Sequence, residues 1–138
     1  MTATLLELPV PAADTTTPWP RLDGAALALG LAELASGAPG PVLVVTAGSG
    51  EASRLAAGIG FFAGEGLPVR MFPGHETLPY DPFSPHPDLV SQRLEALSAL
   101  PELGRGVLVV PLEALLQRLP PRRYVAAHTL ALARGQRL

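Results

Sequence analysis

The chain has 138 residues, of which 48% are hydrophobic and 16% are charged. This length predicts one domain with a single core, and the composition excludes an intrinsically disordered segment. The sequence contains no cysteine, which excludes disulfides, thiolate metal sites and a cysteine nucleophile. No apolar run approaches the roughly 20 residues that span a bilayer, and the first ten residues lack the basic region of a signal peptide, so we expect no membrane contact and a cytoplasmic protein.

Charge is distributed unevenly along the chain, although the formal net charge is only −2. Residues 1–92 hold three arginines and nine acids, whereas residues 93–138 hold seven arginines and three acids. The weak net charge argues against a surface built mainly to coat nucleic acid. The arginines near the end predict either a basic face that meets phosphates or a following domain, or an ordinary solvated surface. They are Arg118, Arg122, Arg123, Arg134 and Arg137.

Residues 1–20 are rich in Thr, Pro and Ala and predict an extended lead-in, which docks through Trp19 or is partly disordered. A first helix is expected from the N-cap Asp23 to the stop at Gly37. Its apolar residues recur at helical spacing, which predicts a buried stripe. The stripe consists of Leu27, Leu31 and Leu34.

Residues 42–46 form a short run of aliphatic and β-branched residues, which predicts a strand buried on both faces. A second helix is expected from Glu51, with Leu55, Ile59 and Phe62 on one face, and the glycines of residues 64–66 close it. Residues 67–72 predict a second strand.

A third helix is expected after His86, because Pro87 suits the first helical position and Asp88 suits the positive end of the helix dipole. Its expected buried stripe is Val90, Leu94 and Leu97, and Pro101 ends it.

Residues 106–110 predict a third strand, and residues 128–133 predict a last strand. Between them a short helix is expected over residues 111–119, which holds Leu112, Leu115, Leu116 and Leu119. Alternating helices and strands with short connections predict an α/β domain with a parallel sheet between two helical layers, a three-layer α/β/α fold.

The turn at residues 47–50 follows a strand and opens a helix, as phosphate-binding loops do. Such a loop needs a lysine for the phosphates and a hydroxyl for Mg²⁺, but Glu51 and Ala52 stand in those places. Ser53 likewise replaces the third glycine of the dinucleotide pattern. We expect a plain strand-to-helix turn, and a small phosphate-binding enzyme that uses residues 46–50 is the weaker alternative.

Four side chains that can bind metals or transfer protons lie close together in the sequence: His75, Glu76, Asp81 and His86. Such a cluster suggests a metal site or an acid–base site. Their spacing matches no familiar ligand pattern, and the intervening prolines separate the side chains, so we expect no metal and a structural loop. Arg93, on the following helix, is expected to form a structural ion pair with Glu76 or Asp81.

Residues 72–97 begin as a proline-rich loop and continue as an amphipathic helix, and long ordered loops in compact domains are usually functional. The sequences ETLPYD, FSPH and S-x-R-L in this stretch resemble the amino-terminal module of the bacterial transcription-repair coupling factors (Mfd). That module is itself similar to the first domain of UvrB. The resemblance covers residues 22–138, and its motif residues are expected to be structural or to lie at an interface. They are Glu76, Leu78, Pro79, Tyr80, Asp81, Ser84, Pro85, His86 and Arg93.

The resemblance implies a degenerate P-loop, helicase-like domain of the UvrB domain 1a type, which has kept its fold and lost its catalysis. In that arrangement the phosphate loop precedes the first helix, where only Gly24 remains here, without a lysine or hydroxyl after it. We therefore expect a chain that is not an enzyme and holds no cofactor. Too few residues separate Tyr80 from Asp88 to build the DNA-threading hairpin of UvrB, so no base-specific DNA contact is expected, and Tyr80 and Phe83 are expected to pack in the protein.

By the resemblance, the parent is a DNA-dependent ATPase translocase of helicase superfamily 2, which uses ATP and Mg²⁺ elsewhere, displaces stalled RNA polymerase and recruits UvrA in nucleotide excision repair. Residues 21–134 would form the UvrB-like domain, and residues 135–138 would begin a linker to the UvrA-recruiting domain. The chain is then a non-catalytic scaffold or regulatory module. Its partners would be the other domains and, through them, UvrA, RNA polymerase and double-stranded DNA. A stand-alone interaction domain of the same fold is the alternative.

Overall fold

The computed structural model describes residues 5–75, 77, 82 and 84–129. Within these residues helices and strands alternate, as the sequence predicts. The order is α1 (Gly24–Gly37), β1 (Pro41–Thr46), α2 (Ser49–Ala63), η1 (Gly64–Gly66), β2 (Val69–Met71), α3 (Pro87–Ala99), η2 (Leu100–Glu102), β3 (Gly106–Pro111), α4 (Leu112–Leu115) and α5 (Arg122–His128). None of the helices in these ranges has the length and apolar character needed to cross a membrane.

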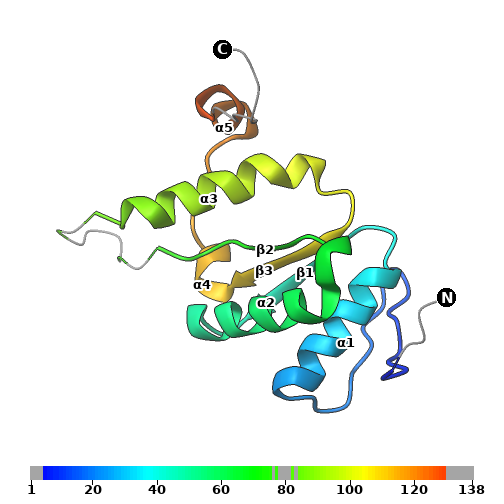
Figure 1. Ribbon diagram of the computed structural model, residues 1–138. Coiled ribbons are helices and arrows are strands. Elements are labelled where there is room, and N and C mark those ends of the chain that lie inside the picture. The colour runs from blue at the N-terminus through cyan, green and yellow to red at the C-terminus, as the bar shows by residue number, and fades with distance from the viewer. Residues whose placement is uncertain (1–4, 76, 78–81, 83, 130–138) are drawn as a thin grey trace.

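The three strands of the described chain form a parallel sheet in the order β1-β3-β2. The chain passes from β1 to β2 through α2 and returns to the central position through α3. Because parallel crossovers are right-handed, two connections that run in opposite directions place their helices on opposite faces. Figure 1 shows α1 and α2 on one face and α3 on the other, with α5 beyond α3. The predicted α/β class with a parallel sheet is confirmed.

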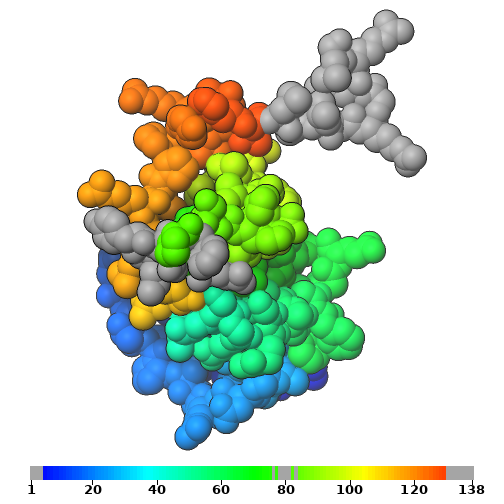
Figure 2. Space-filling view, turned by 90° about the vertical axis from the view of Figure 1, so that its left-hand side faces the viewer, coloured from blue at the N-terminus to red at the C-terminus, as the bar shows by residue number. Residues whose placement is uncertain are grey.

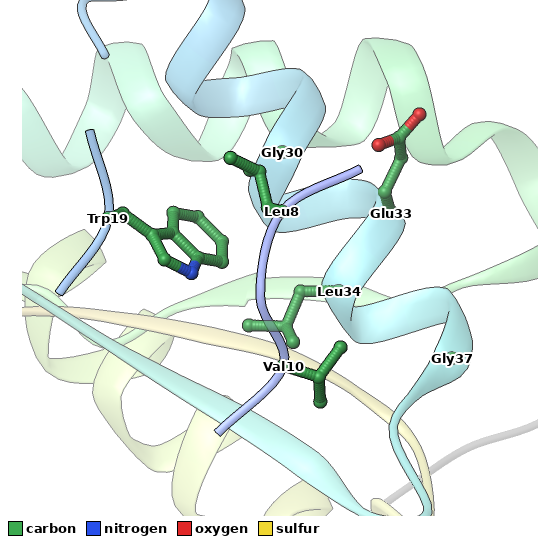
Figure 3. Close-up of a pocket in the computed structure, with 7 residues that line it drawn as sticks. All are labelled: Leu8, Val10, Trp19, Gly30, Glu33, Leu34 and Gly37. Carbon is green, nitrogen blue, oxygen red and sulfur yellow. The ribbon is translucent and has the colours of Figure 1, made fainter. Parts of the chain in front are cut away.

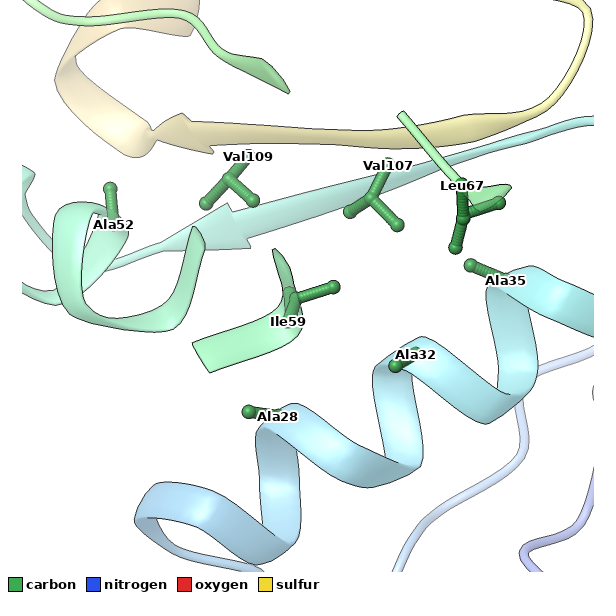
Figure 4. Close-up of a cluster of buried hydrophobic side chains, with 8 residues drawn as sticks. All are labelled: Ala28, Ala32, Ala35, Ala52, Ile59, Leu67, Val107 and Val109. Atoms are coloured by element: carbon green, nitrogen blue, oxygen red, sulfur yellow. The ribbon is translucent and has the colours of Figure 1, made fainter. Parts of the chain in front are cut away.

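The larger core lies between the sheet and the helices α1 and α2 (Figure 4). The residues of α1 that face it are alanines, while the predicted leucine stripe is only half-buried, so the prediction placed the buried face of α1 one residue off. Small side chains allow the two helices to approach closely: a Cβ built on Gly58 would lie 2.9 Å from Cβ of Ala28. The buried residues of this core are Ala28, Ala32, Ala35, Ala52, Ile59, Leu67, Val107 and Val109.

Strand β1 lies at the edge of the sheet and is covered on one face only. Val42 and Val44 pack against the larger core, whereas Leu43 and Val45 are 55% and 48% exposed. The prediction that residues 42–46 are buried on both faces is therefore wrong. The smaller core lies on the face of the sheet that α3 covers. Among the described residues it includes Val110 of the central strand but no residue of β1, so that face of β1 is open.

Helix α3 begins at Pro87 after the N-cap His86, as predicted, but buries a different face. Arg93 and Ala96 are its buried residues, and Val90 is 38% exposed. Of the predicted stripe, Leu97 packs against the smaller core and Leu94 is half-buried. The buried arginine lies against the ring of Phe72, the residue after β2.

Two further predictions concern the residues after β3. The helix expected over residues 111–119 is a single turn, α4, which buries Ala114. The leucines of this stretch are exposed: Leu112, Leu115, Leu116 and Leu119. His128, expected to begin a strand, is the last residue of helix α5, and residues 130–133 lie outside the described residues.

Residues 5–20 form an irregular segment along the outer side of α1 (Figure 3). Both oxygens of the Glu33 carboxylate accept hydrogen bonds from the backbone N–H groups of Leu5 and Leu6. The indole N–H of Trp19 donates to the carbonyl oxygen of Pro9 at 2.9 Å. The segment is thus tied both to the helix and to itself.

Candidate functional site at the carboxyl edge of the sheet

The carboxyl ends of the three strands meet at one edge, where Thr46 is aligned with Pro111 and Met71 with Val109. In parallel α/β sheets this is the edge at which ligands bind. Three segments leave it: the turn into α2, residues 72–75, and α4. Figure 2 looks onto this side of the molecule, where the beginning of α2, in teal, lies beside α4, in yellow to orange.

The N-terminus of α2, the position of a bound phosphate in P-loop proteins, already has two carboxylates near it. Glu51 Oε2 accepts a hydrogen bond from the backbone N–H of Ala47 at 3.0 Å. Glu113 Oε1, from α4, accepts a hydrogen bond from the hydroxyl of Ser49 at 2.8 Å. Negative side chains stabilise the positive end of a helix dipole. The predicted strand-to-helix turn is present, and its Ala47 N–H and Ser49 hydroxyl are hydrogen-bonded within the protein.

The approach of Glu113 to this turn depends on a glycine in the segment after β2. A Cβ built on Gly74 would lie 3.2 Å from Cγ of Glu113, closer than most real contacts of this kind. Glycine at this position therefore leaves room for the carboxylate to reach Ser49.

Arg93 anchors the same segment to α3. Its side chain is 5% exposed, its guanidinium carbon lies 4.2 Å from the ring centroid of Phe72, and its Nη1 donates to the carbonyl oxygen of Pro73. Burial lowers the pKa of Arg93, yet arginine keeps its charge in proteins. The start of the loop is thus held by a hydrogen bond and by a cation–π contact.

The neighbouring His75 is half-buried, and burial, followed by the charge of Arg93, lowers its pKa. Its Nδ1 is buried and has no hydrogen-bond partner in the described structure. The ring is therefore favoured in its neutral form.

No protein-family model matches the sequence. The chain is 43% identical over 117 residues to the transcription-repair-coupling factor of Escherichia coli, which covers 85% of the chain and 10% of that protein. It is 36% identical over 111 residues to that of Haemophilus influenzae, again 10% of the relative, and 41% identical over 90 residues to that of Mycobacterium tuberculosis. The chain is homologous to part of the transcription-repair-coupling factors. It spans about a tenth of the length of the first two relatives.

Of the coupling-factor motif predicted from the sequence, the structure describes only the second half. Ser84 and Pro85 lead into α3, and His86 caps it, since its Nδ1 accepts a hydrogen bond from the backbone N–H of Asp88 at 3.3 Å. The first half of the motif lies outside the described residues: Glu76, Leu78, Pro79, Tyr80 and Asp81. It includes both predicted ion-pair partners of Arg93, Glu76 and Asp81. The interface role of this motif stays a prediction.

The remaining predicted positions are the vestigial phosphate loop at Gly24 and the arginines near the end of the chain. Gly24 is the first residue of α1, with φ +55°. Arg118, Arg122 and Arg123 are exposed, and the ion pairs of the described residues do not include them. Arg134 and Arg137 lie outside the described residues. No group of three or more His, Asp or Glu side chains within the described ranges is placed to hold a metal.

Sequence reasoning missed Glu113 and Gly74. One signal was available. In a parallel sheet, the turns that follow two neighbouring strands lie at the same edge, so a carboxylate just after one strand lies close to the turn that follows the other strand. The order of the strands, which brings β1 beside β3, was needed to use that signal.

Proposed function

We propose that this chain is a non-catalytic scaffold module of a transcription-repair-coupling factor. The parent would be an ATP-dependent DNA translocase, cytoplasmic, that displaces stalled RNA polymerase and recruits UvrA for nucleotide excision repair. The module would support the UvrA-recruiting domain and help to hold the resting factor closed, while ATP and Mg²⁺ act elsewhere in the parent.

The observation that carries the non-catalytic role is the pair of carboxylates at the N-terminus of α2. A phosphate placed there would lie beside Glu51 and Glu113. Two like charges about 4 Å apart repel by about 4 kcal/mol at an effective dielectric of about 20. The turn has no lysine to offset this repulsion. The first turn of α1, where the UvrB-like arrangement would hold its phosphate loop, lacks one too.

The open face of β1 supports the scaffold role. Parallel sheets are normally covered on both faces, and their hydrophobic strands lose stability when they remain in water. Leu43 and Val45 form such an uncovered surface, and Leu116, 81% exposed, lies beyond the carboxyl edge. Other domains of the parent are the proposed cover for these side chains.

Two measurements test the proposal. An antibody against this chain should detect a cellular product several times heavier than 14.3 kDa. A cellular product of only 14.3 kDa would instead favour the stand-alone interaction domain. Titration of the chain with Mg²⁺-ATP in a calorimeter should give no heat of binding, and micromolar affinity would contradict the non-catalytic role. If Glu51→Ala created ATP binding, the small phosphate-binding enzyme would become the better account.

A further inference from the structure

The hydrogen bonds of β3 show which of its residues point toward β1. The N–H of Val107 donates to the carbonyl oxygen of Pro68, and the carbonyl oxygen of Val109 accepts from the N–H of Phe72. These two residues of β3 therefore direct their backbone groups toward β2. Neighbouring residues of a strand direct these groups to opposite sides. Leu108, between them, points toward β1.

The register then identifies the residues of β1 that face outward. Leu108 is aligned with Leu43. In a parallel pair, a residue is bonded to the two neighbours of its aligned partner, so Val42 and Val44 face β3. Leu43 and Val45 direct their N–H and C=O groups away from the sheet. Their side chains are also the exposed ones of the strand, so both the backbone and the side chains of these two residues lack a cover within the described chain.

The two edges of the sheet differ in what they can accept. Strand β2 has only three residues, and Arg70 in its middle pairs with Glu95 of α3 at 3.4 Å. Short edge strands and charged side chains are common protections against further pairing. Strand β1 has six residues and no charge, and its one proline stands at the first position, which is compatible with pairing. The edge at β1 is thus the one that suits a further strand.

The handedness of crossovers selects the direction and the face. The chain passes from β2 to β3 through α3 (Figure 1). A connection from β3 to a new parallel strand beyond β1 crosses the sheet in the same direction, so its helix lies on the same face as α3. On this face the side chains of Leu43 and Val45 are open. One parallel strand and its crossover helix therefore pair the edge and cover these side chains together.

A second copy of this chain satisfies the edge only in part. Two copies of β1 pair about a two-fold axis perpendicular to the sheet, which makes the strands antiparallel and keeps each face of the sheet continuous. The smaller core of each copy includes no residue of β1 among the described residues. Leu43 and Val45 of both copies would therefore stay in water.

We propose that β1 accepts a further parallel strand from the rest of the parent factor, and that the helix before this strand packs on Leu43 and Val45. The strand that fits is uncharged and matches the six residues of β1 in length. The chain spans about a tenth of its first two relatives, so the strand comes from the remaining length, and this step rests on the proposed function.

The test is hydrogen–deuterium exchange at single backbone amides, in the isolated chain and in the parent protein. In the isolated chain, the amides of Leu43 and Val45 should exchange fast, and the amide of Val44, which faces β3, should exchange slowly. In the parent, the amides of Leu43 and Val45 should exchange at least about tenfold more slowly than in the isolated chain, because they then donate to the added strand.

Two variants separate the strand from its helix. Val45→Pro removes an outward N–H and keeps the pairing with β3, since proline is tolerated where an edge strand faces outward. In the parent it should return the Leu43 amide to fast exchange. Leu43→Ser should speed exchange of the Val45 amide in the parent, because it weakens the packing of the helix. Leu119→Ser is the matched control, at 53% exposure against 55% for Leu43, and should leave that exchange unchanged. Circular dichroism establishes that each variant is folded.

Fast exchange of both amides in a parent several times heavier than 14.3 kDa would overturn the added strand alone. A cellular product of only 14.3 kDa would overturn the proposed function and the added strand with it. Slow exchange that Val45→Pro leaves unchanged would indicate a helix without a strand and would also overturn the proposal. Slow exchange in the isolated chain that is lost on dilution would assign the edge to a second copy of this chain instead.

Discussion

Ser49 and Glu113 are 64 residues apart in the sequence, yet the hydroxyl of the first donates a 2.8 Å hydrogen bond to the carboxylate of the second. This contact joins the turn after β1 to the turn after β3. It places a carboxylate of α4 beside the N-terminus of α2.

The Ser49–Glu113 contact should appear as a coupling energy in a double-mutant cycle. Ser49→Ala and Glu113→Ala are each expected to lower the free energy of unfolding by about 1 kcal/mol, and the double variant by less than the sum. Urea denaturation of the four proteins measures the coupling. Strict additivity would show that the hydrogen bond contributes nothing in solution.

Replacing Arg93 should be among the most destabilising changes in the chain. Arg93→Met keeps much of the apolar packing but removes the cation–π contact and the donor to the Pro73 carbonyl, which leaves a polar group unpaired. A loss of about 2–3 kcal/mol in the free energy of unfolding is expected. Arg118→Met, at an exposed site, is the control and should change stability by less than about 0.5 kcal/mol. Equal effects of the two substitutions would contradict the anchoring role.

Gly30→Ala should loosen the amino-terminal segment. A Cβ at this position would lie 2.5 Å from Cδ1 of Leu8 and 3.5 Å from the Trp19 ring, so the Leu8 side chain has to move out of its packed position beside Trp19. Trp19 is the only tryptophan, and its fluorescence should therefore move to longer wavelength. Shortening the opposing side chain, in the double variant Leu8→Ala/Gly30→Ala, should restore the spectrum.

Gly60→Ala is the matched control for this substitution, because no atom lies within 4 Å of the added methyl group. Inside α2 it should raise the free energy of unfolding by about 0.5–1 kcal/mol through helix propensity. An unchanged Trp19 spectrum in Gly30→Ala would contradict the expected loosening of the segment.

His75 should make stability depend on pH. Its folded-state pKa lies below the unfolded value of about 6.5 because of burial and of Arg93. The unfolded state then binds the proton more readily, so the stability contributed by the neutral ring is present above pH 6.5 and is lost as the pH falls through the folded-state pKa. Urea midpoints at neutral and mildly acidic pH should differ less in His75→Gln than in the parent, and an equal difference in the two proteins would contradict the role of His75.

The positions of the strands could be predicted because aliphatic runs stand between glycines and prolines, but their burial could not. Residues 42–46 have the composition of a strand covered on both faces, and only the order β1-β3-β2 shows that β1 is an edge. In α1 the sequence pointed to the larger leucines, whereas close packing against α2 selects the alanine face. These outcomes depend on partners distant in sequence, which local patterns do not specify.

The part of the candidate site that follows local rules was predictable. Pro87 and Asp88 indicated the start of α3 directly, and the glycines of residues 48–50 after an aliphatic run indicated the turn into α2. The roles of Glu113 and Gly74 were not predictable, since each is defined by a contact across the sheet edge.

The central position of β3 has a consequence for biosynthesis. This strand is the last of the three to be made, and both β1 and β2 pair with it and not with each other. While residues 41–71 emerge from the ribosome, neither strand has its hydrogen-bonding partner. The sheet forms only once residues 106–111 are available, so this domain must remain without its sheet through most of its own synthesis, with its aliphatic strands exposed to other nascent chains.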